Sequence, residues 1–387
     1  MSATATNIPV IVVTSAFAIA FVMGAIAQRT NFCIMGAVSD VMNMGDWGRM
    51  RMWMLAVAVA IAGAGGLYAS GAIDLSKSLY TRPTVPWLSY VVGGVVFGIG
   101  MTLGSGCGNK TLVRVGGGSL KSLVVLAFMA IAGYMTLKGL FGMGRVAWLD
   151  PVALNLGDWK LSGQDLPSLL GPALALDKKT AIAGFSALAS ILLLAFIVKD
   201  GHFRRSVDGW LGGVVIGACI VAGWYVSGKI GFGENPDTLE TVYFATNTRT
   251  IESFSFIAPS AFGLEMLLLW SDKSLKLTFG IAALLGVIAG SAAYALVTRT
   301  FRWEGFRSTE DTANHIVGGI LMGFGGVTSV GCTVGQGITG LSTLAVGSVR
   351  IPFVTIGGRR IAAFSSGTSE VAHGCESPYR TESGRRY

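Results

Sequence analysis

The chain has 387 residues, of which 52% are hydrophobic and 13% are charged, and its mean hydropathy is +0.61. These values lie far from the averages of soluble domains and exclude an ordinary water-soluble protein. The net charge of +8 fits the excess of Lys and Arg in the short cytoplasmic loops of membrane proteins, so it is no evidence for nucleic-acid binding.

Long apolar runs predict an all-α polytopic membrane protein with about eight or nine transmembrane helices, because a spanning helix needs about 20 apolar residues. The runs cover residues 8–27, 52–73, 87–103, 122–140, 180–198, 210–226, 275–297 and 316–330, with a ninth candidate at 254–270. No basic segment precedes the first run, and it is longer than the apolar part of a signal peptide. We therefore expect it to remain in the bilayer.

Basic residues gather at 202–205, at 299–307 and in the tail. All three clusters are candidates for the cytoplasmic side. Three apolar runs separate the first two clusters if the run at 254–270 spans the membrane, and two if it only dips in. The preference of basic residues for the cytoplasmic side does not by itself decide between these two topologies.

The chain also contains an internal repeat. The segment VGGVVFGIGMTLGSGCGNK (92–110) aligns without a gap with VGGILMGFGGVTSVGCTVG (317–335), and this alignment matches five glycines and places Cys107 on Cys332. A weaker relative, MGAIAQRTNFCIMG, carries a glycine nine positions before Cys33, as the other two segments do before their cysteines. Glycine-rich breaks related by duplication are typical of transporters whose site lies at a repeat interface.

From this pattern we predict one transmembrane transporter domain, residues 1–349. Its first repeat covers about 10–143 and its second about 180–349, with a polar loop at 145–179 between them. The basic tail at 350–387 loses the apolar pattern and is predicted to be disordered.

The five cysteines form no CxxC pair and have no histidine at metal-ligand spacing, so we expect free thiols, no metal and no cofactor. Cys219 lies within an apolar run and is predicted to be a core residue. Cys375 lies in the tail and is interpreted as an incidental exposed thiol. The other three, Cys33, Cys107 and Cys332, each follow a break at the end of an apolar run.

These breaks have the composition of an anion site. Glycines such as Gly106 and Gly331 permit left-handed backbone and expose N–H groups, which can form concave anion-binding nests. Candidate donor side chains near the breaks are Asn31, Asn109, Lys110 and Gln336. A ligand held by such donors is expected to be an anion, and one also held by thiols is expected to have a soft, polarisable atom.

Simpler interpretations exist for each feature. A buried cysteine is often only a small hydrophobic residue, and Lys110 could extend to the membrane interface. Glycine pairs in membrane helices mostly serve packing, which is how we interpret the pairs at 93–94 and 318–319. The repeated spacing of glycine and cysteine at a helix end favours a site instead.

Three segments, RTNFCIMGAVSD (29–40), GSGCGNKTLVRVGGGSLKSL (104–123) and SVGCTVGQGITGLS (329–342), resemble the motif loops of the YeeE/YedE family of sulfur transporters. The characterised members of that family take up thiosulfate. The resemblance covers roughly residues 10–348. It implies a bacterial inner-membrane protein of two related halves, with short re-entrant helices that form an hourglass.

The resemblance also implies roles for Cys33, Cys107 and Cys332, which family members present to thiosulfate on the outward face and along the pore. We expect these thiols to be neutral, because a thiolate would repel the dianion whereas an S–H can donate a weak hydrogen bond to its soft sulfur. Several weak sites in series also allow the ion to leave. Because the sequence shows no sulfur-carrier domain of the TusA type, we expect any such carrier to be a separate partner on the cytoplasmic side.

Two other functions stay open. A channel or transporter for another sulfur or selenium anion is compatible with the same residues, because these anions are similar in size and softness. A membrane thiol oxidoreductase is less consistent with the sequence, because such enzymes depend on closely paired thiols and the chain has no CxxC. The chain is therefore predicted not to be an enzyme.

Overall fold

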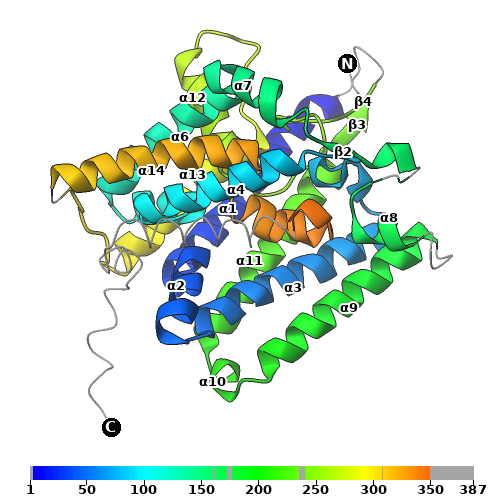
Figure 1. Cartoon of the computed structure of the whole chain (residues 1–387), viewed down its shortest axis with the longest axis horizontal. Helices are drawn as coiled ribbons and strands as arrows, with labels where there is room; N and C mark the ends of the chain where they lie inside the picture. The colour runs from blue at the N-terminus through cyan, green and yellow to red at the C-terminus, as the bar shows by residue number, and fades with distance from the viewer. Residues whose placement is uncertain are drawn as a thin grey trace.

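The computed structural model describes residues 3–348 apart from 160, 162, 172–176, 235–239 and 307. The tail that the sequence predicts to be disordered, including Cys375, lies outside these residues. The described part is a bundle of helices with two small antiparallel sheets, as Figure 1 shows. The sheets pair β1 (Thr84–Val85) with β2 (Leu154–Asn155) and β3 (Phe232–Glu234) with β4 (Thr241–Tyr243).

The long helices coincide with the apolar runs to within a few residues. They are α1 (Ala3–Thr30), α3 (Gly48–Ala69), α4 (Trp87–Leu103), α6 (Leu120–Lys138), α9 (Lys178–Val198), α11 (Val207–Tyr225), α13 (Phe279–Val297) and α14 (Thr309–Thr328). The shorter helices are α2 (Ile34–Met44), α5 (Gly108–Gly116), α7 (Leu140–Gly144), α8 (Leu166–Leu170), α10 (Gly201–Arg204) and α12 (Ile257–Leu268). Six further short turns in the described part are η1 (Leu75–Lys77), η2 (Leu79–Thr81), η3 (Arg145–Leu149), η4 (Leu156–Trp159), η6 (Val226–Ile230) and η7 (Gly335–Gly340).

Seven helical segments among the described residues are long and apolar enough to cross a membrane, so the prediction of an all-α polytopic membrane protein is confirmed. The number is lower than the predicted eight or nine. Helix α14, which begins with the acidic Glu310 and Asp311, is not among the seven. Helix α12 has 12 residues and is therefore about 18 Å long, too short for a hydrocarbon core of about 30 Å. The ninth candidate run therefore does not span.

Both internal basic clusters lie on one face of the bundle, which we call the basic face. Arg29, at the end of α1, forms an ion pair with Asp208 at the start of α11, next to the first cluster (N···O 3.3 Å). Gly117 lies beside Gln28 of α1 and accepts a backbone hydrogen bond from Arg302 of the second cluster (3.1 Å). The two clusters therefore meet around the end of α1, as expected if only α11 and α13 cross between them.

Glycines hold α4 and α14 in close contact, with α6 on the other side of α14 (Figure 1). A Cβ atom at Gly325 would lie 2.5 Å from the backbone N of Phe97, and one at Gly93 would lie 2.6 Å from the backbone N of Ser329. Such contacts leave no room for any larger residue, which agrees with the packing role inferred for the glycine pairs. This crossing fixes the ends of α4 and α14, where two of the cysteine loops begin.

The predicted polar loop packs onto the bundle around Gln164, whereas other parts of it, such as Trp148, are exposed. Gln164 and Asp165 are buried. Backbone hydrogen bonds run from Leu166 N to Leu344 O and from Val346 N to Gln164 O, each 3.0 Å, so the loop docks on the chain that follows η7. The internal duplication, the limits of its halves and the hourglass shape stay predictions.

Candidate functional site

The three cysteine loops share one backbone geometry. The residue two positions before each cysteine has a left-handed conformation, at Asn31 (φ 50°), Ser105 (φ 54°) and Val330 (φ 61°). The residue just before each cysteine then donates its N–H to the carbonyl five positions earlier, a bond typical of helix ends. These bonds are Phe32 N to Ala27 O (3.1 Å), Gly106 N to Met101 O (3.1 Å) and Gly331 N to Gly326 O (2.8 Å).

This geometry corrects one detail of the sequence prediction. Gly331 has a positive φ of 151°, as expected of a glycine in a break, but Gly106 has none. The main reversal of the chain occurs one residue earlier, at a non-glycine residue in all three loops. Left-handed conformation is uncommon for such residues, so its occurrence at three equivalent positions indicates that the surrounding structure imposes it.

Cys33 and Cys107 are the N-cap residues of the short helices α2 and α5, and Cys332 lies three residues before η7. The Gly36 N–H donates to Cys33 Sγ at 3.4 Å, and the Gly335 N–H donates to Cys332 Sγ at 3.3 Å. The Lys110 N–H interacts with the Cys107 thiol in the same way, although its geometry is too loose for a capping hydrogen bond. A thiol that accepts such a bond still has its own hydrogen to donate.

The structure brings the three loops together. The Cys107 thiol interacts with the Cys33 thiol and with the side chain of Thr333, the residue after Cys332. A Cβ atom at Gly108 would lie 3.9 Å from Cys332 Cβ. The three cysteines are free thiols, and each is at most 3% exposed. They therefore form one buried cluster, which we call the thiol cluster, and face neither lipid nor water.

Two cations lie next to the thiol cluster. Lys110 is 7% exposed, and its Nζ donates to the Asn31 side-chain oxygen, which ties the first cysteine loop to the second. Arg114 donates to the backbone oxygen of Ser105 at 2.9 Å and braces the second loop. A buried cation is costly unless anionic or polar groups surround it, so Lys110 makes this region favourable for an anion.

Two buried side-chain oxygens beside the cluster have no hydrogen-bond partner among the described residues. They are Asn109 Oδ1 and Thr333 Oγ1, and the contact between Thr333 and Cys107 falls outside hydrogen-bond geometry. Buried polar atoms are normally satisfied, and a bound ligand is one way of satisfying them. Thr333 was absent from the predicted site, and its position next to Cys332 was the only signal for it in the sequence.

The Gln336 amide, predicted to be a donor for the ligand, forms hydrogen bonds within the chain. Its side-chain nitrogen donates to the backbone oxygens of Ser329 (3.0 Å) and Val330 (3.2 Å), and its oxygen accepts from Ser348 (2.6 Å). Both ends of the amide are therefore used within the chain. Gln336 braces the third cysteine loop by binding carbonyls that the left-handed turn leaves without helical partners.

Cys219 lies apart from the thiol cluster. It is 6% exposed on α11, and its thiol donates a long hydrogen bond to the backbone oxygen of Ile19 (3.8 Å). This position agrees with the predicted core role. Among the described residues, no three His, Cys, Asp or Glu side chains come close enough to hold a metal ion.

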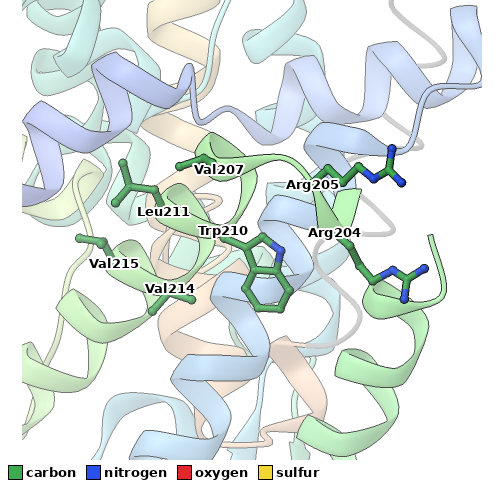
Figure 2. A pocket seen from close by; sticks show the side chains of 7 residues that line it. All are labelled: Arg204, Arg205, Val207, Trp210, Leu211, Val214 and Val215. Atoms are coloured by element: carbon green, nitrogen blue, oxygen red, sulfur yellow. The ribbon is translucent and has the colours of Figure 1, made fainter. Parts of the chain in front are cut away.

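A groove of about 440 Å³ on the outside of α11 is a weaker candidate for an ion site. Figure 2 shows Arg204 and Arg205 on one side of the Trp210 ring, with apolar side chains on the other. Apart from the two arginines its lining side chains are hydrophobic, and it includes no residue of the cysteine loops. It offers an ion far fewer partners than the thiol cluster does.

The segment before α12 packs against the third cysteine loop and carries a buried acid. Thr339 of η7 donates to the Phe254 backbone oxygen at 2.8 Å. Glu252 lies two residues before Phe254 and is partly exposed as a residue. Its Oε1 atom is buried and has no hydrogen-bond partner among the described residues. Burial raises the pKa of Glu252 from 4.5 to about 7, against opposing hydrogen bonds from the Asn247 backbone and the Thr248 hydroxyl.

Replacing Glu252 with glutamine should therefore change how stability depends on pH. Between pH 4.5 and about 7 the folded chain holds more protons than the unfolded chain, so wild-type stability falls as pH rises through this window and stays lower above it. Glutamine has no charge to bury and removes this fall. The melting temperature of Glu252→Gln relative to wild type, in detergent, should be higher at about pH 8 than at about pH 5. An equal difference at both pH values would contradict the assignment.

The fold and the site together define a polytopic membrane protein with interrupted helices, the architecture that secondary transporters use for substrate sites. Comparison with known proteins gives the particular family. The chain matches the family model described as sulphur transport over residues 29–360 and belongs to that family. The resemblance to YeeE/YedE transporters predicted from the motif loops is thereby confirmed.

Two curated relatives are similar along most of their length. The chain is 24% identical to "Thiosulfate transporter TsuA" of Escherichia coli (strain K12) over 326 residues, which covers 82% of this chain and 84% of the relative. It is also 24% identical to "Thiosulfate transporter TsuA" of Spirochaeta thermophila over 349 residues, which covers 85% and 92% respectively.

Proposed function

We propose that this protein takes up thiosulfate across the bacterial inner membrane and that the ion passes between the neutral thiols of Cys33, Cys107 and Cys332. The observation that carries the proposal is the convergence of three thiols from three distant loops in one buried cluster. The names of the two curated relatives support thiosulfate as the ion. The excess of Lys and Arg on the basic face favours that face as the cytoplasmic one.

The chemistry of the cluster suits a divalent anion with one soft sulfur. The charged oxygens are stabilised by Lys110 and by the Thr333 hydroxyl, whose oxygen has no hydrogen-bond partner among the described residues. The N-termini of α2 and α5 add partial positive charge. The terminal sulfur meets thiol hydrogens, which are weak donors and therefore hold it loosely. Loose binding at neighbouring thiols allows the ion to move from one to the next.

A growth experiment tests this proposal. The full chain is expressed in a bacterial strain that lacks other thiosulfate uptake, with thiosulfate as the sole sulfur source, and uptake of ³⁵S-thiosulfate is measured in the same cells. Growth and uptake above the empty-vector control are expected. Normal expression in the membrane without uptake would contradict the proposal.

Competition then identifies the preferred anion. An excess of unlabelled thiosulfate should reduce labelled uptake more than equal concentrations of sulfate, sulfite or selenite. Stronger competition by one of the other anions would show that this anion, and not thiosulfate, is the preferred substrate. A separate carrier of the TusA type at the basic face stays a prediction.

A further inference from the structure

A cavity of about 590 Å³ opens on the face of the bundle opposite the basic face. It lies between the end of α3, the start of α9, the turn η6 that continues α11, and the hairpin of β3 and β4. Helix α11 begins at the basic face, so η6 at its far end places the cavity on the other side of the membrane-spanning bundle.

Four lysines line this cavity, Lys77, Lys178, Lys179 and Lys229. None of the four forms an ion pair with a described residue. Lys77 Nζ lies 5.5 Å from the centre of the Phe232 ring, a cation–π contact that keeps the ammonium at the cavity wall. Four lysines without ion pairs in one cavity indicate an excess of positive charge there.

Acidic groups near the cavity cancel part of this charge but are fewer than the lysines, since Asp74, Asp165 and Asp177 are the acids close enough to act on Tyr68 of the lining. Asp74 is the one acid among the lining residues, and its carboxylate already accepts hydrogen bonds from the backbone and the hydroxyl of Ser76. Tyr68 and Tyr243 add hydroxyl groups that can donate to an oxyanion. The lining therefore combines four cations, one anion and neutral donors, with a net positive charge.

A second and much smaller pocket, which we call the slot, lies beside the cavity and shares Ser76 and Lys178 with it. The slot leads to Ser342, whose hydroxyl accepts a hydrogen bond from Trp224 Nε1 (2.9 Å). Its volume of about 10 Å³ holds no more than about one water molecule. The cavity, which we call the chamber, is thus open at the surface, and the slot that reaches the chain after η7 is nearly filled.

We infer that this chamber is an entry vestibule that captures small divalent oxyanions before they reach the thiol cluster. The identity of the ion as thiosulfate rests on the proposed function, whereas the capture of divalent oxyanions rests on the lysines themselves. Charges within one cavity act together because the Debye length at physiological ionic strength is about 8 Å. A cleft lined by one sign of charge raises the local concentration of the opposite ion and the rate of association, and salt weakens this effect.

Uptake kinetics test the vestibule with a matched control. Lys178→Gln/Lys229→Gln removes two positive charges from the chamber, whereas Lys273→Gln/Lys276→Gln removes two exposed charges between α12 and α13, outside it. We expect the first variant to raise the KM for thiosulfate about tenfold with little change in maximal rate, and to reduce the dependence of uptake on salt. An equal KM for both double variants would overturn the inference, because the effect would then reflect net charge.

A binding measurement separates this inference from the proposed function. Purified protein in detergent is labelled with an amine-reactive ester in chloride, sulfate or thiosulfate at constant ionic strength. Sulfate and thiosulfate should slow the labelling of the four vestibule lysines relative to Lys273 and Lys276. Equal labelling rates in all three salts would overturn the vestibule. Protection by sulfate in a protein that fails to take up thiosulfate would support the vestibule and contradict only the proposed substrate.

Discussion

Replacing Cys107 with alanine should reduce thiosulfate uptake at least about tenfold, the factor that corresponds to a loss of about 1.4 kcal/mol from the barrier. Cys107 is the thiol at the centre of the cluster, because it interacts with Cys33, with Thr333 and with the backbone of Lys110. Alanine removes a donor for the soft sulfur at this position and offers nothing in its place. Initial rates of ³⁵S-thiosulfate uptake, normalised to the amount of protein in the membrane, measure the effect.

The same loss is expected for Cys33→Ala and Cys332→Ala. Serine at each position should retain more uptake than alanine, because a hydroxyl still donates, although to a soft sulfur less suitably than a thiol does. Cys219→Ala is the matched control, since Cys219 is also buried but its thiol is hydrogen-bonded to α1 outside the cluster. Uptake by this variant should stay near wild type. Wild-type uptake by all three cluster variants would refute the relay between thiols.

Replacing Gly325 with valine should both destabilise the protein and abolish most uptake. A Cβ atom at this position would lie 2.5 Å from the Phe97 backbone nitrogen and 2.7 Å from the Gly93 oxygen, so α4 and α14 would have to separate. Overpacking of this kind costs about 1–3 kcal/mol. Because the loops of Cys107 and Cys332 follow the ends of these two helices, their separation also displaces the thiols.

Gly184→Val provides the control for this substitution. Gly184 lies within α9, and no described atom outside its own stretch of helix lies within 4 Å of the position that its Cβ would occupy. The change in helix propensity is therefore similar in both variants, and only Gly325→Val adds a clash with another helix. Melting temperature in detergent and uptake in cells should both fall for Gly325→Val relative to Gly184→Val. Equal values would show that the crossing tolerates a wider separation.

The long helices could be predicted from the sequence because lipid leaves few alternatives. A run such as 87–103 must satisfy its backbone hydrogen bonds internally, and α4 covers the same residues. The run at 254–270 was ambiguous because apolar composition alone does not fix where a helix ends. Only its observed length, 12 residues in α12, shows that it does not span.

The candidate site was predictable in part. The spacing of glycine and cysteine identified Cys33, Cys107 and Cys332, and the structure brings all three together with Lys110 and Asn31. The direction in which individual side chains point could not be predicted from the sequence. Gln336 has the composition of a ligand donor, yet its amide folds back onto two carbonyls of its own loop. Thr333, chemically less distinctive, has the oxygen that finds no partner.

The sequence by itself determined that the chain is a membrane protein in which three apolar runs end in a break followed by a cysteine. Hydropathy and spacing are local properties of the chain, so they can be read without the structure. Only the tertiary structure decided that these breaks meet, that Asn31, Ser105 and Val330 are left-handed, and that four lysines from separate segments share one chamber. The physical reason is that such arrangements depend on how distant helices pack, and close packing at glycines such as Gly325 fixes positions that no local pattern encodes.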